Sequence, residues 1–234
     1  MSSKAILLKR NPSDDAKHAA LMALNPVQMV TYTATNAIPA AITVADTADY
    51  LLVTGGHGDF VASAPTKFND LPVAMAKPWI ASLKGDFHAI ILDTCFSSAF
   101  APSFLGHLEM GGYIVCAHGS GEGWAMGFDA SDPNKTVGDA LAGVVGSADG
   151  MGLGYSSISL LQRGDKGLRL LTANTGATRT AGLTAREGMG MDHDNAAELA
   201  QLDSYLGRFN ILVQPIANAE LQTRLRQALK MPVL

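Results

Sequence analysis

Residues 88–98 read HAIILDTCFSS, and this stretch decides the fold class. Its first half is a short apolar run of the kind expected for a buried strand in a parallel sheet, and its second half turns abruptly polar. The longer segments on both sides of it have helical composition. A buried strand between helical segments is typical of a strand–helix–strand crossover, so the stretch predicts an α/β fold with a mostly parallel sheet.

The same alternation of strands and helices extends in both directions along the chain. Strands are predicted at residues 5–9, 29–34, 50–53, 88–95, 113–117 and 209–214, with a hairpin formed by residues 158–162 and 168–173. Helices are predicted at residues 16–24, 39–45, 71–83, 96–110, 136–147 and 219–231. These elements predict a three-layer α/β/α arrangement in which a central, mostly parallel sheet is covered by helices on both faces.

The domain organisation follows from length and from the weaker pattern near the C-terminus. We expect a single domain over residues 1–234, with a catalytic core in residues 1–150 and further strands and a helix in residues 151–234. Residues 174–195 are rich in Gly, Thr and Ala and have no apolar period. Loops of about twenty residues are usually functional or disordered, so we predict a mobile loop there.

Composition excludes several classes of function. The formal net charge is −4 and the 17 basic residues are scattered, so the chain lacks the basic stripe that nucleic-acid binding requires. No apolar run approaches the ~18–20 residues that span a bilayer, and none resembles a signal peptide. The sequence therefore predicts a soluble, cytoplasmic protein that binds neither nucleic acid nor the membrane interior. Secretion by a route without a cleaved signal is the alternative.

Polar residues gather where three predicted strands end. His57 follows the strand at residues 50–53, Asp93 and Cys95 end the strand at residues 88–95, and the loop from His118 to Glu122 follows the next strand. In an open parallel sheet, ligands bind beyond the carboxyl ends of the strands. A histidine on one strand end can deprotonate a thiol on its neighbour, so this edge is the predicted active site.

Two cysteines and two histidines compete for these roles. A strand cysteine is commonly only a small apolar side chain, and we expect this of Cys116, whose neighbours are apolar. Cys95 lies between Asp93 and two serines, which favours a functional thiol. His57 stands between glycines, and the unobstructed N–H of Gly58 is suited to an oxyanion. A turn histidine at His57, with His118 as the base, is the alternative.

A metal site is a further alternative at the same edge. His57, Asp59, Asp93, Cys95 and His118 carry suitable donor atoms, but no helix carries paired ligands at metal spacing. Two cysteines are also too few for a cysteine-rich zinc site. We therefore predict no metal and no other cofactor.

The two motifs together resemble the caspase-like cysteine peptidases, which include caspases, metacaspases, legumains, gingipains, separases and bacterial CHAT-domain proteases. The resemblance rests on an apolar strand ending in Gly-His-Gly at residues 56–58 and a later one ending in residues 93–98, DTCFSS. It implies that Cys95 is the nucleophile, that His57 is the general base and acid, and that the main-chain amides of Gly58 and Cys95 form the oxyanion hole.

The resemblance also implies a substrate. Members that cleave after basic residues, or after asparagine, have an acidic residue two positions before the cysteine, where this chain has Asp93. The exit loop of the next strand lines the specificity pocket, which assigns Ser120 and Glu122 to substrate binding. The expected activity is that of a cysteine endopeptidase acting on a protein or peptide after a basic P1 residue.

Two other classes of protein share part of this pattern. A glycine-rich turn with a histidine, followed by a strand-end cysteine, is similar to the DJ-1-like amidotransferase superfamily, in which the cysteine lies on a strained elbow. A caspase-like domain that binds without turnover is the second alternative.

Regulation is the last expectation that the resemblance suggests. Peptidases of this group are often inactive until an activator binds or a loop is cut, and a basic-specific enzyme can cut itself in an exposed loop. The candidate self-cleavage positions are Lys135, Arg179 and Arg186. An ordinary surface loop without a regulatory role is the alternative.

Overall fold

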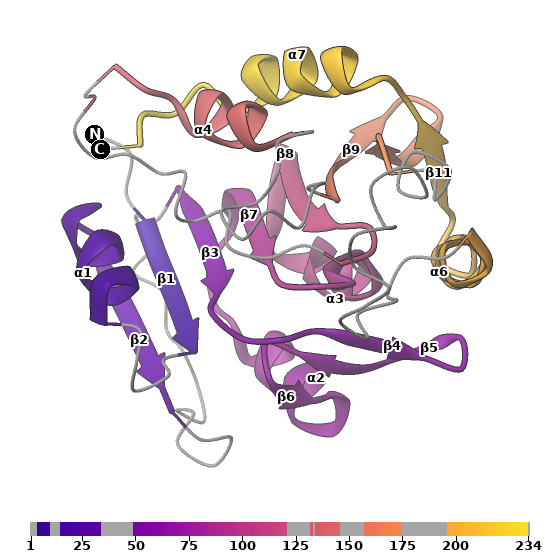
Figure 1. Cartoon of the computed structure of the whole chain (residues 1–234), viewed down its shortest axis with the longest axis horizontal. Helices are drawn as coiled ribbons and strands as arrows, with labels where there is room; N and C mark the ends of the chain where they lie inside the picture. The colour runs from indigo at the N-terminus through magenta and orange to yellow at the C-terminus, as the bar shows by residue number, and fades with distance from the viewer. Residues whose placement is uncertain are drawn as a thin grey trace, which may run out of the picture.

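The computed structural model describes residues 4–9, 15–33, 49–120, 132, 134–145, 157–174 and 196–233. These residues form a mixed α/β fold built on one large sheet (Figure 1). The predicted helix at residues 39–45 lies outside the described residues, as does the predicted mobile loop except for its first residue, Asn174.

The large sheet has eight strands in the order β2-β1-β3-β7-β8-β9-β10-β11. Their bounds are β1 Lys4–Lys9, β2 Gln28–Tyr32, β3 Tyr50–Thr54, β7 Phe87–Asp93, β8 Leu108–Ala117, β9 Ile158–Gly164, β10 Gly167–Thr172 and β11 Ile211–Pro215. Strand β9 is antiparallel to both its neighbours, and every other adjacent pair is parallel. The predicted mostly parallel sheet is confirmed.

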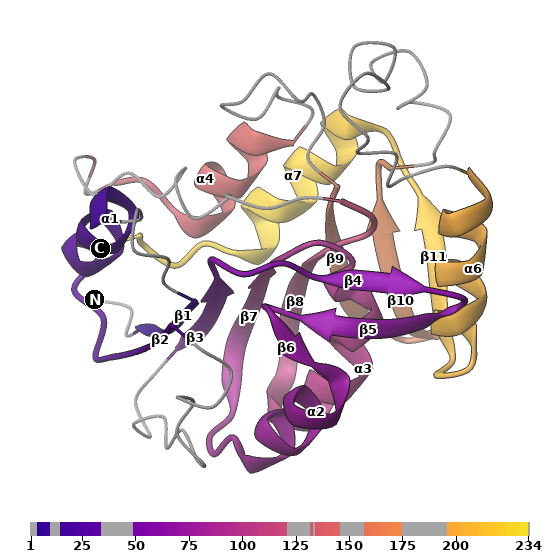
Figure 2. The same cartoon turned by 60° about the horizontal axis from the view of Figure 1, so that its bottom comes forward.

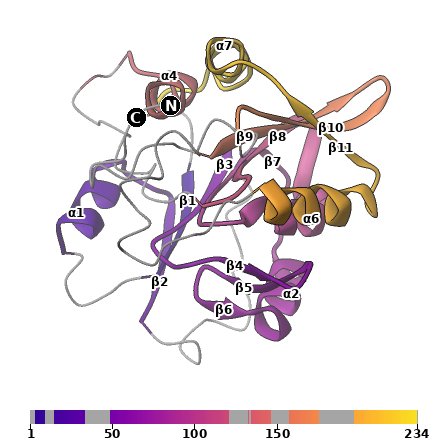
Figure 3. The ribbon, with the colours of Figure 1, turned by 45° about the vertical axis from the view of Figure 1, so that its right-hand side comes forward.

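Helices cover both faces of this sheet, which gives three layers (Figure 3). Helices α1 (Asp15–Ala23), α4 (Val137–Val144) and α7 (Asn218–Ala228) contribute to the apolar cluster on one face. Helices α2 (Val73–Ser82), α3 (Ala101–Phe104) and α6 (Ala196–Gly207) contribute to the cluster on the other face. Because both faces are covered, the central strands β3 and β7 are apolar at nearly every position rather than alternating.

A second, three-stranded antiparallel sheet, which the sequence pattern did not predict, follows β3. Its strands are β4 (Asp59–Val61), β5 (Ala64–Phe68) and β6 (Leu71–Pro72), and it lies beside α2 (Figure 2). Both of its turns, Ala62-Ser63 and Asn69-Asp70, have two consecutive residues with positive φ. Paired positive φ values are typical of the tight two-residue turns that join antiparallel strands.

The segment after Cys95 differs from its prediction. One helix was expected over residues 96–110, but the structure has a 3₁₀ turn (Ser97–Phe100), the single-turn helix α3 and another 3₁₀ turn (Leu105–His107). Strand β8 then begins at Leu108, five residues before its predicted start. Helix α6 was also not predicted, whereas α1, α4 and α7 form close to the predicted ranges.

Candidate active site at the carboxyl edge of the sheet

Three neighbouring strands bring the predicted site residues to one edge of the large sheet. Strands β3, β7 and β8 are parallel and adjacent, and the last residues of β3 and β7, Thr54 and Asp93, are directly paired. The segments that follow, residues 55–58, 94–96 and 118–120, therefore leave the sheet at the same edge. The predicted convergence of these loops is confirmed.

The Gly-Gly-His-Gly motif after β3 is explained by three close main-chain approaches. Gly55 has a φ of +93°, and a Cβ on it would lie 2.3 Å from the carbonyl oxygen of Lys9. A Cβ on Gly56 would lie 2.5 Å from the carbonyl carbon of Asn69, and one on Gly58 would lie 1.8 Å from the carbonyl oxygen of Cys95. Each glycine thus allows a different neighbour to approach more closely than any side chain permits.

The third approach places the histidine loop directly against the cysteine loop. The Cys95 side chain is half-buried, and His57 is exposed. The two loops are also joined by the buried hydroxyl of Thr94, which donates to the carbonyl oxygen of Gly56 at 2.9 Å. Thr94 was not predicted as a site residue, because a threonine before a strand-end cysteine carries no distinctive signal.

Phe96, directly after the cysteine, holds the Cys95 loop against the exit of β8. It has a φ of 54°, in the left-handed region, and its N–H donates to the carbonyl oxygen of Gly119 at 2.7 Å. A bulky residue in this conformation costs about 1–3 kcal/mol, so the surrounding contacts must hold it there. The Phe96 ring stacks with that of Phe60, whose ring also contacts Tyr205 of α6.

The two serines after Cys95 have buried hydrogen-bond partners. The Ser97 hydroxyl donates to the carbonyl oxygen of Leu92 at 2.7 Å and accepts the N–H of Ala117 at 2.8 Å, which ties the turn to β7 and β8. The Ser98 hydroxyl lies 3.3 Å from Nδ1 of His118. Their polarity, which favoured a functional thiol in the sequence, is therefore also explained by the need to anchor this turn.

His118, the alternative base, is buried and engaged on both ring nitrogens. It is 1% exposed, and its Nε2 lies 2.8 Å from Oδ1 of Asp203 on α6, opposite the contact with Ser98. Its carbonyl oxygen accepts the side-chain amide of Asn174 at 2.6 Å. This arrangement suits a structural link between β8 and α6 better than a base open to substrate.

Asp93 is buried beneath the site. It is fully buried, and its Oδ2 accepts the hydroxyl of Thr54 at 2.7 Å across the β3–β7 pair. Ser120 is half-buried and follows Gly119 in the exit loop of β8, while Glu122 lies outside the described residues. The assignment of these three residues to substrate binding stays a prediction.

Cys116 is fully buried in the core, as the sequence predicted. Burial raises the pKa of its thiol far above the ordinary value, because the apolar surroundings disfavour a thiolate. Of the two thiols, that of Cys95 is the partly exposed one.

Lys135, a candidate self-cleavage position, lies in a segment that is hydrogen-bonded to the C-terminal end of the described chain. Its carbonyl oxygen accepts the N–H of Val233 at 2.9 Å, and Thr136 forms an antiparallel bridge with Pro232. Thr136 also caps α4 together with Asp139. Cleavage after Lys135 would require this pairing to open, and the other candidates, Arg179 and Arg186, lie outside the described residues.

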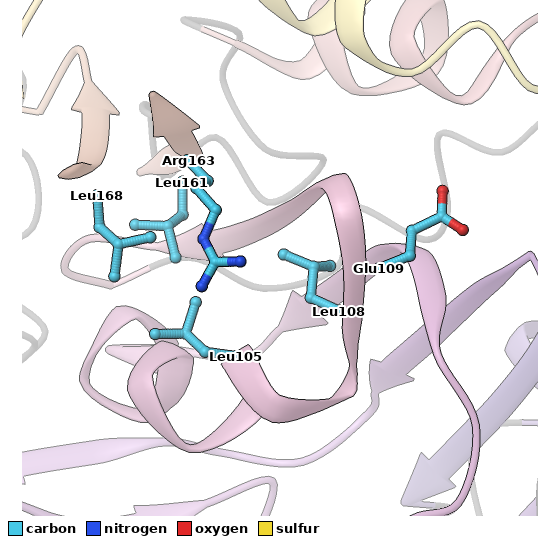
Figure 4. Close-up of a pocket in the computed structure, with 6 residues that line it drawn as sticks. All are labelled: Leu105, Leu108, Glu109, Leu161, Arg163 and Leu168. Atoms are coloured by element: carbon cyan, nitrogen blue, oxygen red, sulfur yellow. The ribbon is translucent and has the colours of Figure 1, made fainter. Parts of the chain in front are cut away.

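A pocket elsewhere in the structure is distinct from this edge. It lies near the start of β8 and the turn between β9 and β10, at the end of β8 opposite the exit loop (Figure 4). It is lined by four leucines and by two charged side chains that point in different directions: Leu105, Leu108, Leu161, Leu168, Glu109 and Arg163.

The described residues contain no group of three His, Cys, Asp or Glu side chains that could hold a metal ion. No helix formed by these residues is long and apolar enough to cross a membrane.

Comparison with known proteins gives no relative from which a role could be transferred. No protein-family model, curated protein or solved structure matches the chain.

Proposed function

We propose that the chain is a caspase-like cysteine endopeptidase in which Cys95 and His57 form the catalytic dyad. The observation that carries this proposal is the contact between Gly58 and the carbonyl oxygen of Cys95, which packs the histidine loop against the cysteine loop. A half-buried thiol and an exposed imidazole on adjoining loops are the two groups that thiol catalysis needs. The order of the histidine and cysteine motifs along the chain, which resembles that of caspase-like peptidases, also supports the proposal.

In the proposed reaction, His57 accepts the proton of the Cys95 thiol, and the sulfur attacks the carbonyl carbon of the scissile bond. The electron pair displaced to the carbonyl oxygen is stabilised by the main-chain N–H groups of Gly58 and Cys95. Collapse of this intermediate breaks the C–N bond, and His57 donates its proton to the departing amine. Water, deprotonated by His57, then hydrolyses the thioester and regenerates the free thiol.

The proposed specificity for a basic P1 residue rests on Asp93 and on the resemblance. Asp93 precedes the nucleophile by two positions and ends β7, the strand whose exit carries Cys95. Its carboxyl group accepts the Thr54 hydroxyl, which fixes its position at the end of the strand. This is the acidic group that we propose to pair with a positively charged P1 side chain.

The test is labelling with a peptidyl ketone whose P1 residue is arginine, followed by mass mapping of the modified residue. We expect label on Cys95, none on Cys95→Ala, and unchanged labelling of Cys116→Ser. A matched reagent with P1 leucine should label far more slowly. A positional-scanning peptide library, with the wild-type protein and Cys95→Ala in parallel, then defines the P1 preference.

The other outcomes of this test correspond to the alternative classes. Fast modification of Cys95 by both reagents would favour a DJ-1-like thiol protein, although the left-handed φ in this chain falls on Phe96 rather than on the cysteine. No modification by either reagent would favour a binding module and would overturn the proposal.

A further inference from the structure

We propose that Asn69 is the positioning residue of the dyad, holding the His57 loop in place against Cys95. This inference rests on the proposed function, because it assigns a role to Asn69 only if His57 and Cys95 act together. Asn69 lies in the turn between β5 and β6 and is fully buried. A buried asparagine in a turn of a small peripheral sheet requires an explanation, since its amide must find partners.

The first part of that explanation is a pair of hydrogen bonds that bracket the histidine. The Asn69 side-chain oxygen accepts the N–H of Gly56 at 2.7 Å, and the N–H of Asp70 donates to the carbonyl oxygen of His57 at 2.7 Å. The turn therefore holds main-chain groups on both sides of the peptide that joins Gly56 to His57. Gly56 has no Cβ, which is what allows this close approach.

The Asn69 side chain is itself held in one orientation by Tyr32 on β2. Its amide nitrogen donates to the Tyr32 hydroxyl oxygen at 2.7 Å, and that hydroxyl donates to the main-chain oxygen of Asn69. Burial is the main cause that raises the pKa of Tyr32 above its usual range, so the phenol stays neutral and keeps its proton to donate. The next residue, Asp70, lies 3.9 Å from the amine of Lys9 on β1. The turn is thus anchored to two strands of the large sheet.

An asparagine meets the backbone requirement of this position as well as the hydrogen bonds. Asn69 has a φ of 49° and Asp70 a φ of 64°, and short polar side chains tolerate the left-handed region better than others do. The histidine loop also meets the Cys95 loop, through Gly58 and through the hydroxyl of Thr94. The main chain around His57 is therefore held both by the turn and by the cysteine loop.

Alkylation of Cys95 by iodoacetamide tests this role without any substrate. The rate is measured by mass spectrometry between pH 5.5 and 9 for the wild type, His57→Ala and Asn69→Gly. Glycine removes the side chain and leaves the left-handed backbone unstrained. Asn210→Gly is the matched control, because Asn210 also has a positive φ of 57° but lies in the turn before β11. Cys116 is fully buried, so the reaction reports on Cys95.

We expect Cys95 of the wild type to be alkylated already at pH values well below ~8.5, the pKa of an ordinary cysteine. The reason is that an imidazole paired with the thiol would stabilise the thiolate. The ratio of the rate at pH 6 to that at pH 8.5 should fall about tenfold in His57→Ala and in Asn69→Gly, and should change less than twofold in Asn210→Gly. Asn69→Asp keeps the oxygen acceptor for Gly56 but loses the donor to Tyr32, so its ratio should lie between those of Asn69→Gly and the wild type.

Two results would overturn the inference, and they are distinguishable from each other. A ratio lost in His57→Ala but unchanged in Asn69→Gly would leave the dyad intact and remove the role of Asn69. A wild type without reactivity at low pH would overturn the dyad itself, and the positioning role with it. If Asn69→Gly does not fold, the same measurement is made on Tyr32→Phe, which removes the hydroxyl that orients Asn69. We expect a smaller fall of the ratio in this variant. An unchanged ratio would overturn the inference.

Discussion

The substitution Gly58→Ala tests the contact on which the proposed function depends. The added Cβ would lie 1.8 Å from the carbonyl oxygen of Cys95 and 2.8 Å from its carbonyl carbon, where real Cβ atoms essentially never approach below 3.0 Å. The two loops must therefore separate by about 1.2 Å. The position of the Cβ is fixed by the main chain of residue 58 and the atoms it meets belong to the main chain of Cys95, so no side-chain rotation relieves the clash.

The expected consequence is a large loss of activity with a moderate loss of stability. A misplacement of ~1 Å in an active site can cost about 10²-fold in rate, and overpacking typically costs about 1–3 kcal/mol of folding free energy. We expect kcat/KM on a fluorogenic peptide with P1 arginine to fall at least about 10²-fold. Thermal unfolding should show that Gly58→Ala remains folded at the assay temperature.

The matched control is Gly143→Ala, in the penultimate position of α4. Apart from its chain neighbours and the backbone of its own helix, no atom of the described residues lies within 4 Å of a Cβ at this position. Alanine should therefore leave the rate unchanged and stabilise the helix by about 0.5–1 kcal/mol. A Gly58→Ala protein with wild-type kcat/KM and wild-type melting temperature would refute the close approach of the two loops and, with it, the main support for the dyad.

Three further predictions concern the dyad, the specificity and the processing of the chain. Cys95→Ala and His57→Ala should each abolish peptide cleavage, with the double mutant no slower than either, while Cys116→Ser keeps its rate; additive losses would show that the two residues do not act as one unit. Asp93→Asn should lose cleavage after arginine and lysine selectively, and equal loss over all P1 residues in the peptide library would indicate a structural role. Intact-mass analysis after incubation should find no fragment that ends at Lys135, because its carbonyl oxygen is hydrogen-bonded to the C-terminal segment. A fragment that ends at Lys135 in the wild type and is missing in Cys95→Ala would contradict this prediction.

The large sheet could be predicted because its central strands are apolar on both faces. The runs in β3 and β7 are buried at nearly every residue, and each changes abruptly to polar residues where the strand ends. The order of these ends along the chain is sufficient to bring them to one edge of a parallel sheet. The small sheet could not be predicted in this way, since β4 has three residues, β6 has two, and prolines interrupt β5 and β6.

The structure shows that the two histidines have different surroundings, which the sequence did not predict. His57 and His118 both follow apolar strands, so the sequence alone left the second as an alternative base. Their surroundings differ because of α6, which was not predicted and which brings Asp203 to the ring of His118. A contact between residues so distant in the chain leaves no local pattern in the sequence.

The glycines of the candidate site are recognisable in the sequence, whereas the residues that they contact are not. A glycine marks a place where no Cβ fits, so three of them around His57 signal close approaches even when the neighbours are unknown. Asn69 is the residue that lies against Gly56. Asparagine followed by aspartate is common in turns, so these two residues do not indicate in the sequence which groups they bind. Its role depends on Gly56, thirteen residues earlier, and on Tyr32 on another strand. The residues that hold a site together are therefore harder to predict than the residues that make room for it.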